Sequence, residues 1–390
     1  MARRKRIAIV IDLGFAVNHH HQTFAGIKAY AEEQGWVYDL WPHAPRELLT
    51  RKRKRTYDGI VGRITPGIAA AARRAKVPVI NTWISSPVKD VPSVAPDYRE
   101  SGRMAVRHLV ARGFVRFAFL GYRRVRFSSQ VRDGFEAAAR DAGCSTTSLL
   151  VRHAFYYNSA EWDTAYQAME AWIGKWDLPM GVVVTEDISA RYLVGVVERL
   201  GLRVPEDVAI IAPDNNTLIC QGLEPTLSSI DLGHDRVGYR AAQLLDDLMR
   251  QRKLAEPQVM LPPAVLHPRR STDHFAVADP LVSQALRFIT EEGHRPIKVK
   301  DVVARVPASV RTLERRFRAV RGRAINDEIR RLRIERVRRL LVESDASLKE
   351  VAAECGFPNP QRLCEAFRRE YGTSPGAYRE QAASEGIRGA

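Results

Sequence analysis

The sequence has few cysteines and no long apolar run. Four cysteines stand among 390 residues with no CxxC pair, which excludes a disulfide framework. No stretch approaches the roughly 18 uncharged apolar residues that a membrane-spanning helix needs. The apolar run of the N-terminal segment MARRKRIAIVIDLG is interrupted at Asp12, so this segment predicts a first strand and not a signal peptide. We therefore expect a cytoplasmic protein that has no membrane partner.

Acidic residues are also few relative to basic ones. The chain has 45 Asp and Glu against 61 Lys and Arg, for a net charge of +16. Such an excess favours a polyanionic partner, because a positive surface releases the counterions that condense on nucleic acid. Residues 281–390 hold 23 basic and 15 acidic residues, so half of the excess lies in about a quarter of the chain.

The first 260 residues alternate short apolar runs with amphipathic segments. The runs IAIVI, YDGIVG, VPVIN, FAFLG, MGVVV and VAIIAPD are typical of buried parallel strands, and segments such as SGRMAVRHLVARG are typical of covering helices. The stretch is about twice as long as one doubly wound α/β sheet requires. We predict an α/β domain of two similar lobes, with a ligand cleft at the carboxyl ends of the strands.

Prolines and an aperiodic segment end this region. Pro262, Pro263 and Pro268 break regular structure, and RRSTDHFAVADP follows without a period. The predicted domains are a two-lobed sensor over 1–268, a linker over 269–280 and an all-α domain over 281–385.

The last 90 or so residues repeat one pattern twice. Val302 and Ala304 in KDVVARV correspond to Val351 and Ala353 in KEVAAEC, and the Leu, Phe and Gly positions that follow recur at an offset of 50. Each repeat predicts a helix-turn-helix unit with a basic second helix. The segment between the units, if helical, has two apolar faces and is buried between two bodies. Its apolar residues are Ile325, Ile329, Leu332 and Leu340 on one face and Ile334, Val337 and Leu341 on the other.

The second helix of each unit is the candidate DNA-reading element. In the first unit Leu313, Phe317 and Val320 should face the core, which turns the arginines outward. An Arg fork suits guanine O6 and N7, and Gln suits adenine N6 and N7. An arbitrary basic helix would only present a solvated face, but the tandem repeat favours DNA reading. The predicted DNA contacts are Ser309, Arg311, Thr312 and Arg315 in the first unit and Asn359, Gln361, Arg362 and Glu365 in the second.

These residues resemble a known family. RTLERRFRAVRG, RLRIERVRRLL and SLKEVAAECGFPNPQRLCEAFRREYGTSPGAYR are similar to the arabinose-regulator (AraC/XylS) type of DNA-binding domain over about 100 residues. The first unit departs from that pattern at PAS, where the family has a glycine before the serine. The resemblance implies a homodimer that binds operator half-sites in double-stranded DNA and activates transcription, with RNA polymerase as a possible partner.

The α/β region resembles the effector domain of the lactose-repressor (LacI/GalR) class. SSQVRDGFEAA, VTEDISARYLVG and VAIIAPDNNTL carry this resemblance, and the fusion of the two domains is similar to bacterial regulators of xylose operons. It implies a pentose effector, D-xylose, with Arg132 donating to sugar oxygens and Asp187 and Asp214 accepting from hydroxyls. Asn215 adds an amide contact.

The first lobe offers fewer candidates. The loop after the first strand provides Phe15 and Gln22 as effector contacts, and Asp97 is either a helix cap or a cleft residue. The consecutive histidines 19–21 point in different directions, which is poor geometry for a metal, so we expect neither a metal nor a cofactor.

Two enzyme classes are the alternatives. A DNA-repair alkyltransferase needs an activated cysteine beside a base, and neither Cys144 nor Cys220 has such a neighbour in sequence. A sugar-metabolising enzyme would need a phosphate loop, a metal triad or a nucleophile motif, and the sequence shows none. We therefore expect a ligand-responsive regulator without catalytic activity.

Overall fold

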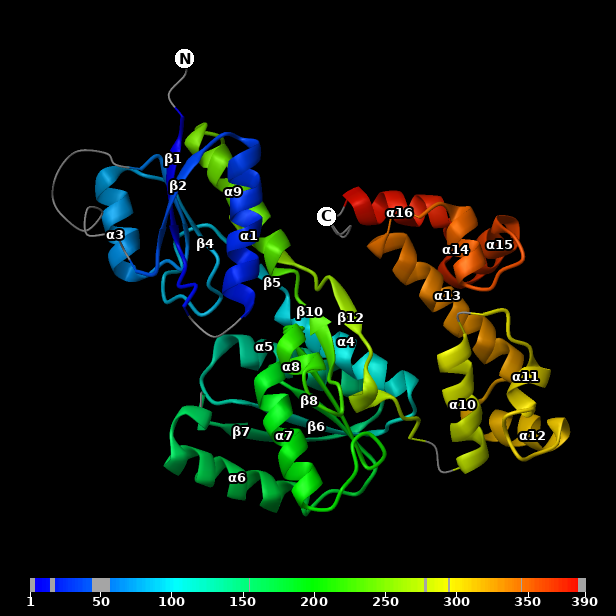
Figure 1. The fold of residues 1–390 in the computed structure, drawn as a ribbon. Coiled ribbons are helices and arrows are strands. Elements are labelled where there is room, and N and C mark those ends of the chain that lie inside the picture. Colours follow the sequence, from blue (N-terminus) through cyan, green and yellow to red (C-terminus); the bar gives the residue numbers. More distant parts are fainter. Residues whose placement is uncertain are drawn as a thin grey trace.

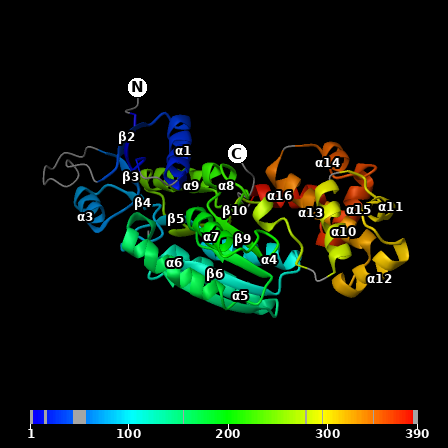
Figure 2. The same ribbon diagram turned by 60° about the horizontal axis from the view of Figure 1, so that its bottom comes forward.

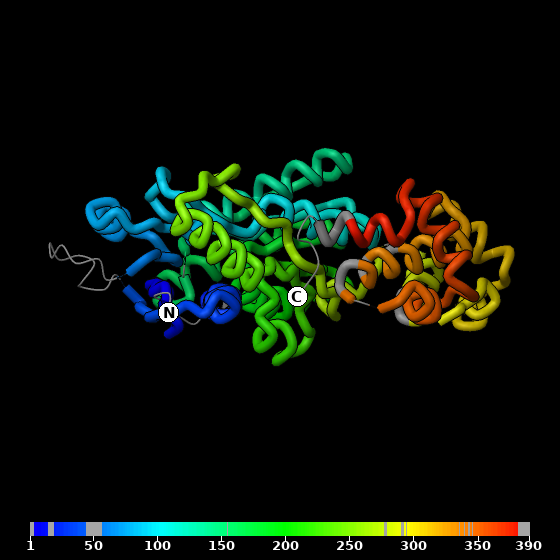
Figure 3. Tube along the Cα trace, turned by 90° about the horizontal axis from the view of Figure 1, so that it is seen from above, coloured from blue at the N-terminus to red at the C-terminus, as the bar shows by residue number. Residues whose placement is uncertain are grey.

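The computed structural model describes residues 4–14, 18–43, 57–153, 155–276, 279–293, 295–344 and 346–384. Phe15, predicted as an effector contact, lies outside these ranges. Figure 1 shows two α/β lobes followed by a helical domain, and Figure 3 shows the helical domain at one end of the long axis. None of the described helices is long and apolar enough to cross a membrane.

The first lobe is built on a sheet of order β11-β5-β4-β3-β1-β2, in which all described pairs are parallel. The central strands β1 and β3 are buried almost throughout, as expected for a sheet that is covered on both faces. The elements of this lobe are β1 (Arg6–Val10), α1 (Asn18–Glu33), β2 (Val37–Trp41), β3 (Gly59–Gly62), α3 (Pro66–Ala75), β4 (Val79–Asn81), β5 (Ser93–Pro96), α9 (His234–Met249) and β11 (Gln258–Leu261).

The second lobe repeats this plan with the order β12-β10-β9-β8-β6-β7. Among the strand pairs of this sheet that the structure describes, β12 alone runs antiparallel to its neighbour, β10. The chain crosses between the lobes after β5, after β10 and after β11, so three connecting segments form the hinge. The elements of this lobe are α4 (Tyr98–Ala111), β6 (Arg116–Tyr122), α5 (Arg126–Asp141), β7 (Ser145–Val151), η1 (Phe155–Tyr157), α6 (Ser159–Ile173), β8 (Met180–Val184), α7 (Asp187–Arg199), β9 (Val208–Pro213), α8 (Thr217–Gln221), β10 (Ser228–Asp231), β12 (Val265–His267) and η2 (Arg270–Thr272).

The helical domain contains the two expected helix-turn-helix units (Figure 2). Leu313 and Phe317 are buried in the core of the first unit, and Leu363 and Phe367 in that of the second. The domain consists of α10 (Pro280–Glu292), α11 (Val299–Val303), α12 (Val310–Arg321), α13 (Ile325–Glu343), α14 (Leu348–Glu354), α15 (Pro360–Tyr371) and α16 (Pro375–Ser384).

The connecting helix α13 contributes to both cores. Ile325 and Ile329 pack in the first unit, and Ile334 and Val337 in the second. Leu340, predicted on the face of Ile325, packs against the second core. The unit that the apolar residues of α13 contact therefore changes along the helix, and the sequence alone does not show where this change occurs.

The prediction that Val320 faces the core is wrong, because Val320 is 40% exposed and lies outside the core of the first unit. Val320 is the last residue but one of α12. Gly322, the C-cap of this helix, has a φ of 66° and turns the chain away. The turn between α11 and α12 contains no positive φ, whereas Gly356 in the second unit has a φ of 70°. The first unit therefore forms its turn without the glycine that the second unit uses.

Candidate functional site

Acidic side chains gather at the carboxyl ends of β8 and β9 in the second lobe. Asp187 begins α7 and is 1% exposed. Its carboxylate accepts hydrogen bonds from the Ser229 hydroxyl at 2.7 Å and from the backbone N–H of Asn216 at 2.8 Å. Burial raises the pKa of Asp187, while these hydrogen bonds oppose the rise. Asp187 therefore holds the loop after β9 in place.

Asp214 is in a different situation. It follows β9 with a φ of 112°, and its backbone N–H donates to the Ile230 carbonyl at 2.9 Å. Burial raises the pKa of Asp214 well above its ordinary value, and the charges of Asp187 and Glu186 add to the rise. Asp214 is nevertheless partly exposed. A carboxylate in such a place gains from a hydroxyl donor supplied by a ligand.

The neighbouring Asn215 is already engaged within the protein. Its backbone N–H donates to Ser229 Oγ at 2.9 Å, and its side-chain Oδ1 accepts from Arg269 at 2.6 Å. The structure thus brings Asp187, Asp214 and Asn215 together at one end of the sheet.

Aromatic side chains stand beside the carboxylates, and the sequence analysis did not select them. The Tyr122 hydroxyl donates to Glu186 and lies 2.7 Å from Ser189 Oγ. The ring of Phe127 lies 5.7 Å from that of Tyr98, and the ring of Tyr122 lies 4.7 Å from that of His153. The pKa of Tyr98 is raised by burial and then by the charges of Asp214 and Glu186. We call this group the cleft cluster: Tyr98, Tyr122, Phe127, His153, Glu186 and Asp214.

Position at strand ends was the signal that could have found these residues. Tyr122 is the last residue of β6, Glu186 follows β8 by two residues, and Tyr98 follows β5 at a crossing between the lobes. In an open parallel sheet such positions face the ligand crevice.

The first lobe contributes polar residues from its own strand ends. The guanidinium of Arg63, which follows β3, lies 4.5 Å from the ring centroid of Trp83 and 3.3 Å from His20 Nε2. The rings of His19 and His234 stack with centroids 5.0 Å apart. Burial lowers the pKa of both histidines, and each is neutral at pH 7. Gln22, the described effector candidate of this lobe, keeps its Oε1 buried and without a hydrogen-bond partner.

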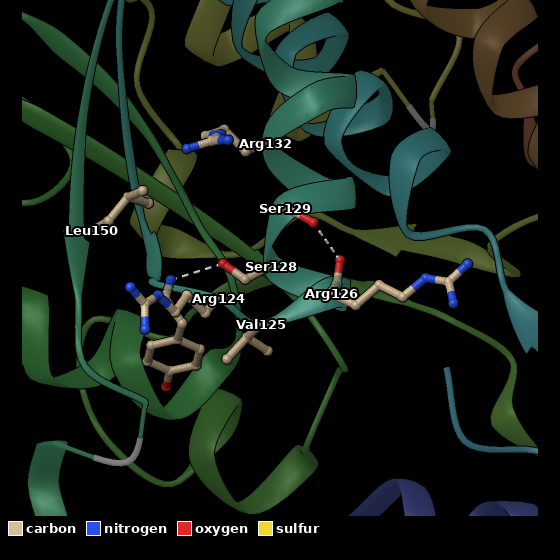
Figure 4. A pocket seen from close by; sticks show the side chains of 8 residues that line it. Arg124, Val125, Arg126, Ser128, Ser129, Arg132 and Leu150 are labelled. Atoms are coloured by element: carbon tan, nitrogen blue, oxygen red, sulfur yellow. Dashed lines mark hydrogen bonds between the residues drawn. The ribbon is translucent and has the colours of Figure 1, made fainter. Parts of the chain in front are cut away.

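Arg132 shares a pocket with one member of the cleft cluster. Its side chain extends toward Leu150 on β7, and the pocket of about 360 Å³ that it lines is also lined by Tyr122, Arg124 and Ser128 (Figure 4). Its Nε lies 3.6 Å from Glu136 on the next turn of α5. Arg126, at the start of the same helix, extends to the other side (Figure 4). The N-cap of α4 is Asp97, whose carboxylate accepts from the Glu100 N–H at 2.9 Å.

The predicted reading helices present their polar residues outward. Arg311 and Arg315 on α12 and Gln361 and Arg362 on α15 are exposed. Ser309 is the N-cap of α12 and accepts a hydrogen bond from the Thr312 N–H. The remaining two predicted contacts, in the second unit, make local bonds: Asn359 caps α15 by accepting from the Arg362 N–H at 2.9 Å, and Glu365 pairs with the Arg362 guanidinium at 2.8 Å.

Comparisons with known proteins agree with both halves of this description. Residues 106–272 match the periplasmic binding protein-like domain, and residues 302–381 match a helix-turn-helix domain. The fold is a type I periplasmic-binding-like α/β domain with a C-terminal helix-turn-helix domain, which is the arrangement of a two-domain class of transcription regulators that the chain resembles.

More particularly, the chain is similar over nearly its whole length to the xylose operon regulatory proteins. It is 29% identical to that of Haemophilus influenzae over 370 residues, which cover 93% of this chain and 95% of the relative. It is 26% identical to that of Escherichia coli K12, with 97% of both chains covered. The solved structure of a xylose-binding transcription activator is similar over 97% of this chain and 99% of its own, with 25% identity and a TM-score of 0.59.

Proposed function

We propose that this chain is a D-xylose-responsive transcription activator that binds operator half-sites as a homodimer in the cytoplasm, recruits RNA polymerase and catalyses no reaction. The cleft cluster is the observation that carries the effector part of this proposal. Sugar hydroxyls are donors and acceptors at once, so buried carboxylates suit them, while an aromatic ring covers the apolar face of the sugar. The names of the relatives support xylose as the pentose.

Asp214 is the proposed primary acceptor, because it is partly exposed and its carboxylate is subject to the charges of Asp187 and Glu186. Asp187 and Asn215 make their hydrogen bonds to the protein and position the loop that carries Asp214. Arg132 remains a proposed effector contact, since it lines one pocket together with Tyr122 of the cleft cluster. Gln22 remains a proposed contact from the first lobe.

The DNA part of the proposal assigns reading to the exposed faces of α12 and α15. Arg311, Arg315, Gln361 and Arg362 are free of the core and carry the donor groups that base edges require. Ser309, Thr312, Asn359 and Glu365 shape the helix starts and orient these donors.

A thermal-shift screen with D-xylose, other pentoses and hexoses tests the effector. D-xylose should raise Tm in wild type and should not do so in Asp214→Ala. Asp133→Ala is the matched control, since Asp133 is an exposed carboxylate on α5 that pairs with Arg99. No response of wild type to any sugar would contradict the effector proposal. Turnover of a pentose by the purified protein would instead favour a sugar-metabolising enzyme.

A further inference from the structure

Helix α4 begins at the cleft cluster and ends at the helical domain. Its first residue, Tyr98, belongs to the cluster, and its last, Ala111, lies about 20 Å further along at 1.5 Å per residue. The helix is packed tightly on α5. A Cβ added at Gly134 would lie 1.8 Å from the Arg99 carbonyl, and one added at Gly102 would lie 2.1 Å from that of Val131. At such an approach the two helices move as one body.

The far end of α4 binds the segment that leads to the DNA-binding domain. The Arg112 Nε donates to the Thr272 carbonyl at 2.7 Å, and the His108 ring nitrogen lies 2.8 Å from the Thr272 hydroxyl. The Ala276 N–H donates to the Arg112 carbonyl at 2.9 Å. Phe275, one residue earlier, is 4% exposed and packs into the core of the first helix-turn-helix unit. The segment predicted as a linker is thus fixed to both domains.

A direct contact joins the same end of α4 to a reading helix. Arg321, the last residue of α12, donates to the Ala111 carbonyl at 3.0 Å and to Glu328 at 3.3 Å. Its side chain is 11% exposed, and that of Glu328 is fully buried. The last carbonyls of a helix carry the negative end of its dipole, which attracts the guanidinium. Glu328 is held in turn by Arg331 at 2.8 Å, so the contact continues into α13.

We propose that α4 transmits effector binding to the DNA-binding domain, with Arg321 and Arg112 as positioning residues that touch neither effector nor DNA. When the effector binds at Tyr98 and its neighbours, α4 shifts with the second lobe, and its far end moves α12. Helix α13, which contributes to both cores, then carries the motion to the second unit. Figures 1 and 2 show α4 directed from the hinge toward the helical domain. This inference rests on the proposed function.

The test compares Arg321→Ala with Arg323→Ala in the full chain. Arg323 is the matched control, because it also pairs with Glu328, at 3.5 Å, while its side chain is 42% exposed. DNA affinity is measured by fluorescence anisotropy with and without D-xylose, and D-xylose affinity by calorimetry. A coupling of about 5- to 150-fold is typical of allosteric proteins. Arg321→Ala should keep the affinity for D-xylose and the DNA affinity without sugar. The change in DNA affinity that D-xylose causes should fall below about 2-fold in this variant, while Arg323→Ala should respond as wild type does.

Arg112→Gln provides a second test from the sensor side, where it leaves the helix-turn-helix cores untouched. Arg112→Gln should lose the sugar-induced change in DNA affinity. It supplies the test even if Arg321→Ala does not bind DNA at all. A wild-type response in Arg112→Gln, or in an Arg321→Ala protein that binds DNA, would overturn the inference. If wild type does not bind D-xylose, the proposed function fails instead, and the calorimetry shows this separately.

Discussion

Replacement of Asp214 by Asn should have opposite effects on effector affinity and on stability. A hydrogen bond to a charged group contributes about 1.5–3 kcal/mol, so loss of the carboxylate should weaken D-xylose binding by roughly 10- to 150-fold. The amide removes a charge that Asp187 and Glu186 repel. It should therefore raise Tm at pH 7, by about 2–4 °C for each kcal/mol gained.

The pH dependence gives the same prediction a second readout. The pKa of Asp214 is raised on folding, so the folded protein binds more protons than the unfolded chain above pH 4. Its contribution to the free energy of unfolding therefore falls as pH rises from about 4 through the raised pKa. Asp214→Asn should flatten this decline in urea unfolding at pH 5–8, while Asp133→Asn keeps it. Unchanged D-xylose affinity in calorimetry, or a lower Tm at pH 7, would refute the reasoning.

Three further predictions concern DNA reading and packing. Arg362→Ala should weaken the free energy of binding to a selected DNA site by about 1–3 kcal/mol and relax the base preference of the protein, whereas the control Arg140→Ala on α5 should do neither. An equal loss of affinity for every DNA sequence would show that Arg362 contacts phosphate and not a base. Gly134→Ala should lower stability by about 1–3 kcal/mol because of the Arg99 carbonyl, while Gly195→Ala, which meets nothing within 4 Å, should be neutral or stabilising in thermal melts. Leu363→Ala should lower the free energy of unfolding of the second unit by about 2–5 kcal/mol, which hydrogen exchange measures as faster exchange of the amides in that unit. Faster exchange only outside the second unit would contradict the core position of Leu363.

The sequence predicted the architecture because each element carries its own periodic signal. Buried parallel strands appear as apolar runs, and the tandem repeat appears as an offset between identical residue types. Strands β1, β3, β4, β6, β8 and β9 fall on the six predicted runs. The error at Val320 lies at the end of a helix, where the turn that follows overrides periodicity.

The candidate site was harder to predict, because a cleft collects residues from distant parts of the chain. Motif similarity selected Asp187 and Asp214, which the fold brings together, but it gave no indication that Asp187 bonds within the protein. Tyr98 and Tyr122 lie in none of the motifs that carry the resemblance, and Glu186, which lies beside Asp187 in one of them, was not selected. Their proximity follows from the sheet order, and the contact between Arg321 and Ala111 spans 210 positions of the chain.

Sugar-dependent DNA binding is the most direct test of the account. A DNA site is first selected from a random library by the full chain with D-xylose, and its affinity is then measured across a D-xylose titration at fixed salt, because phosphate contacts depend on ionic strength. The account predicts a saturable change in affinity with D-xylose that Asp214→Asn shifts to higher sugar concentration. An affinity that stays constant over the titration, in a protein that calorimetry shows to bind D-xylose, would contradict it.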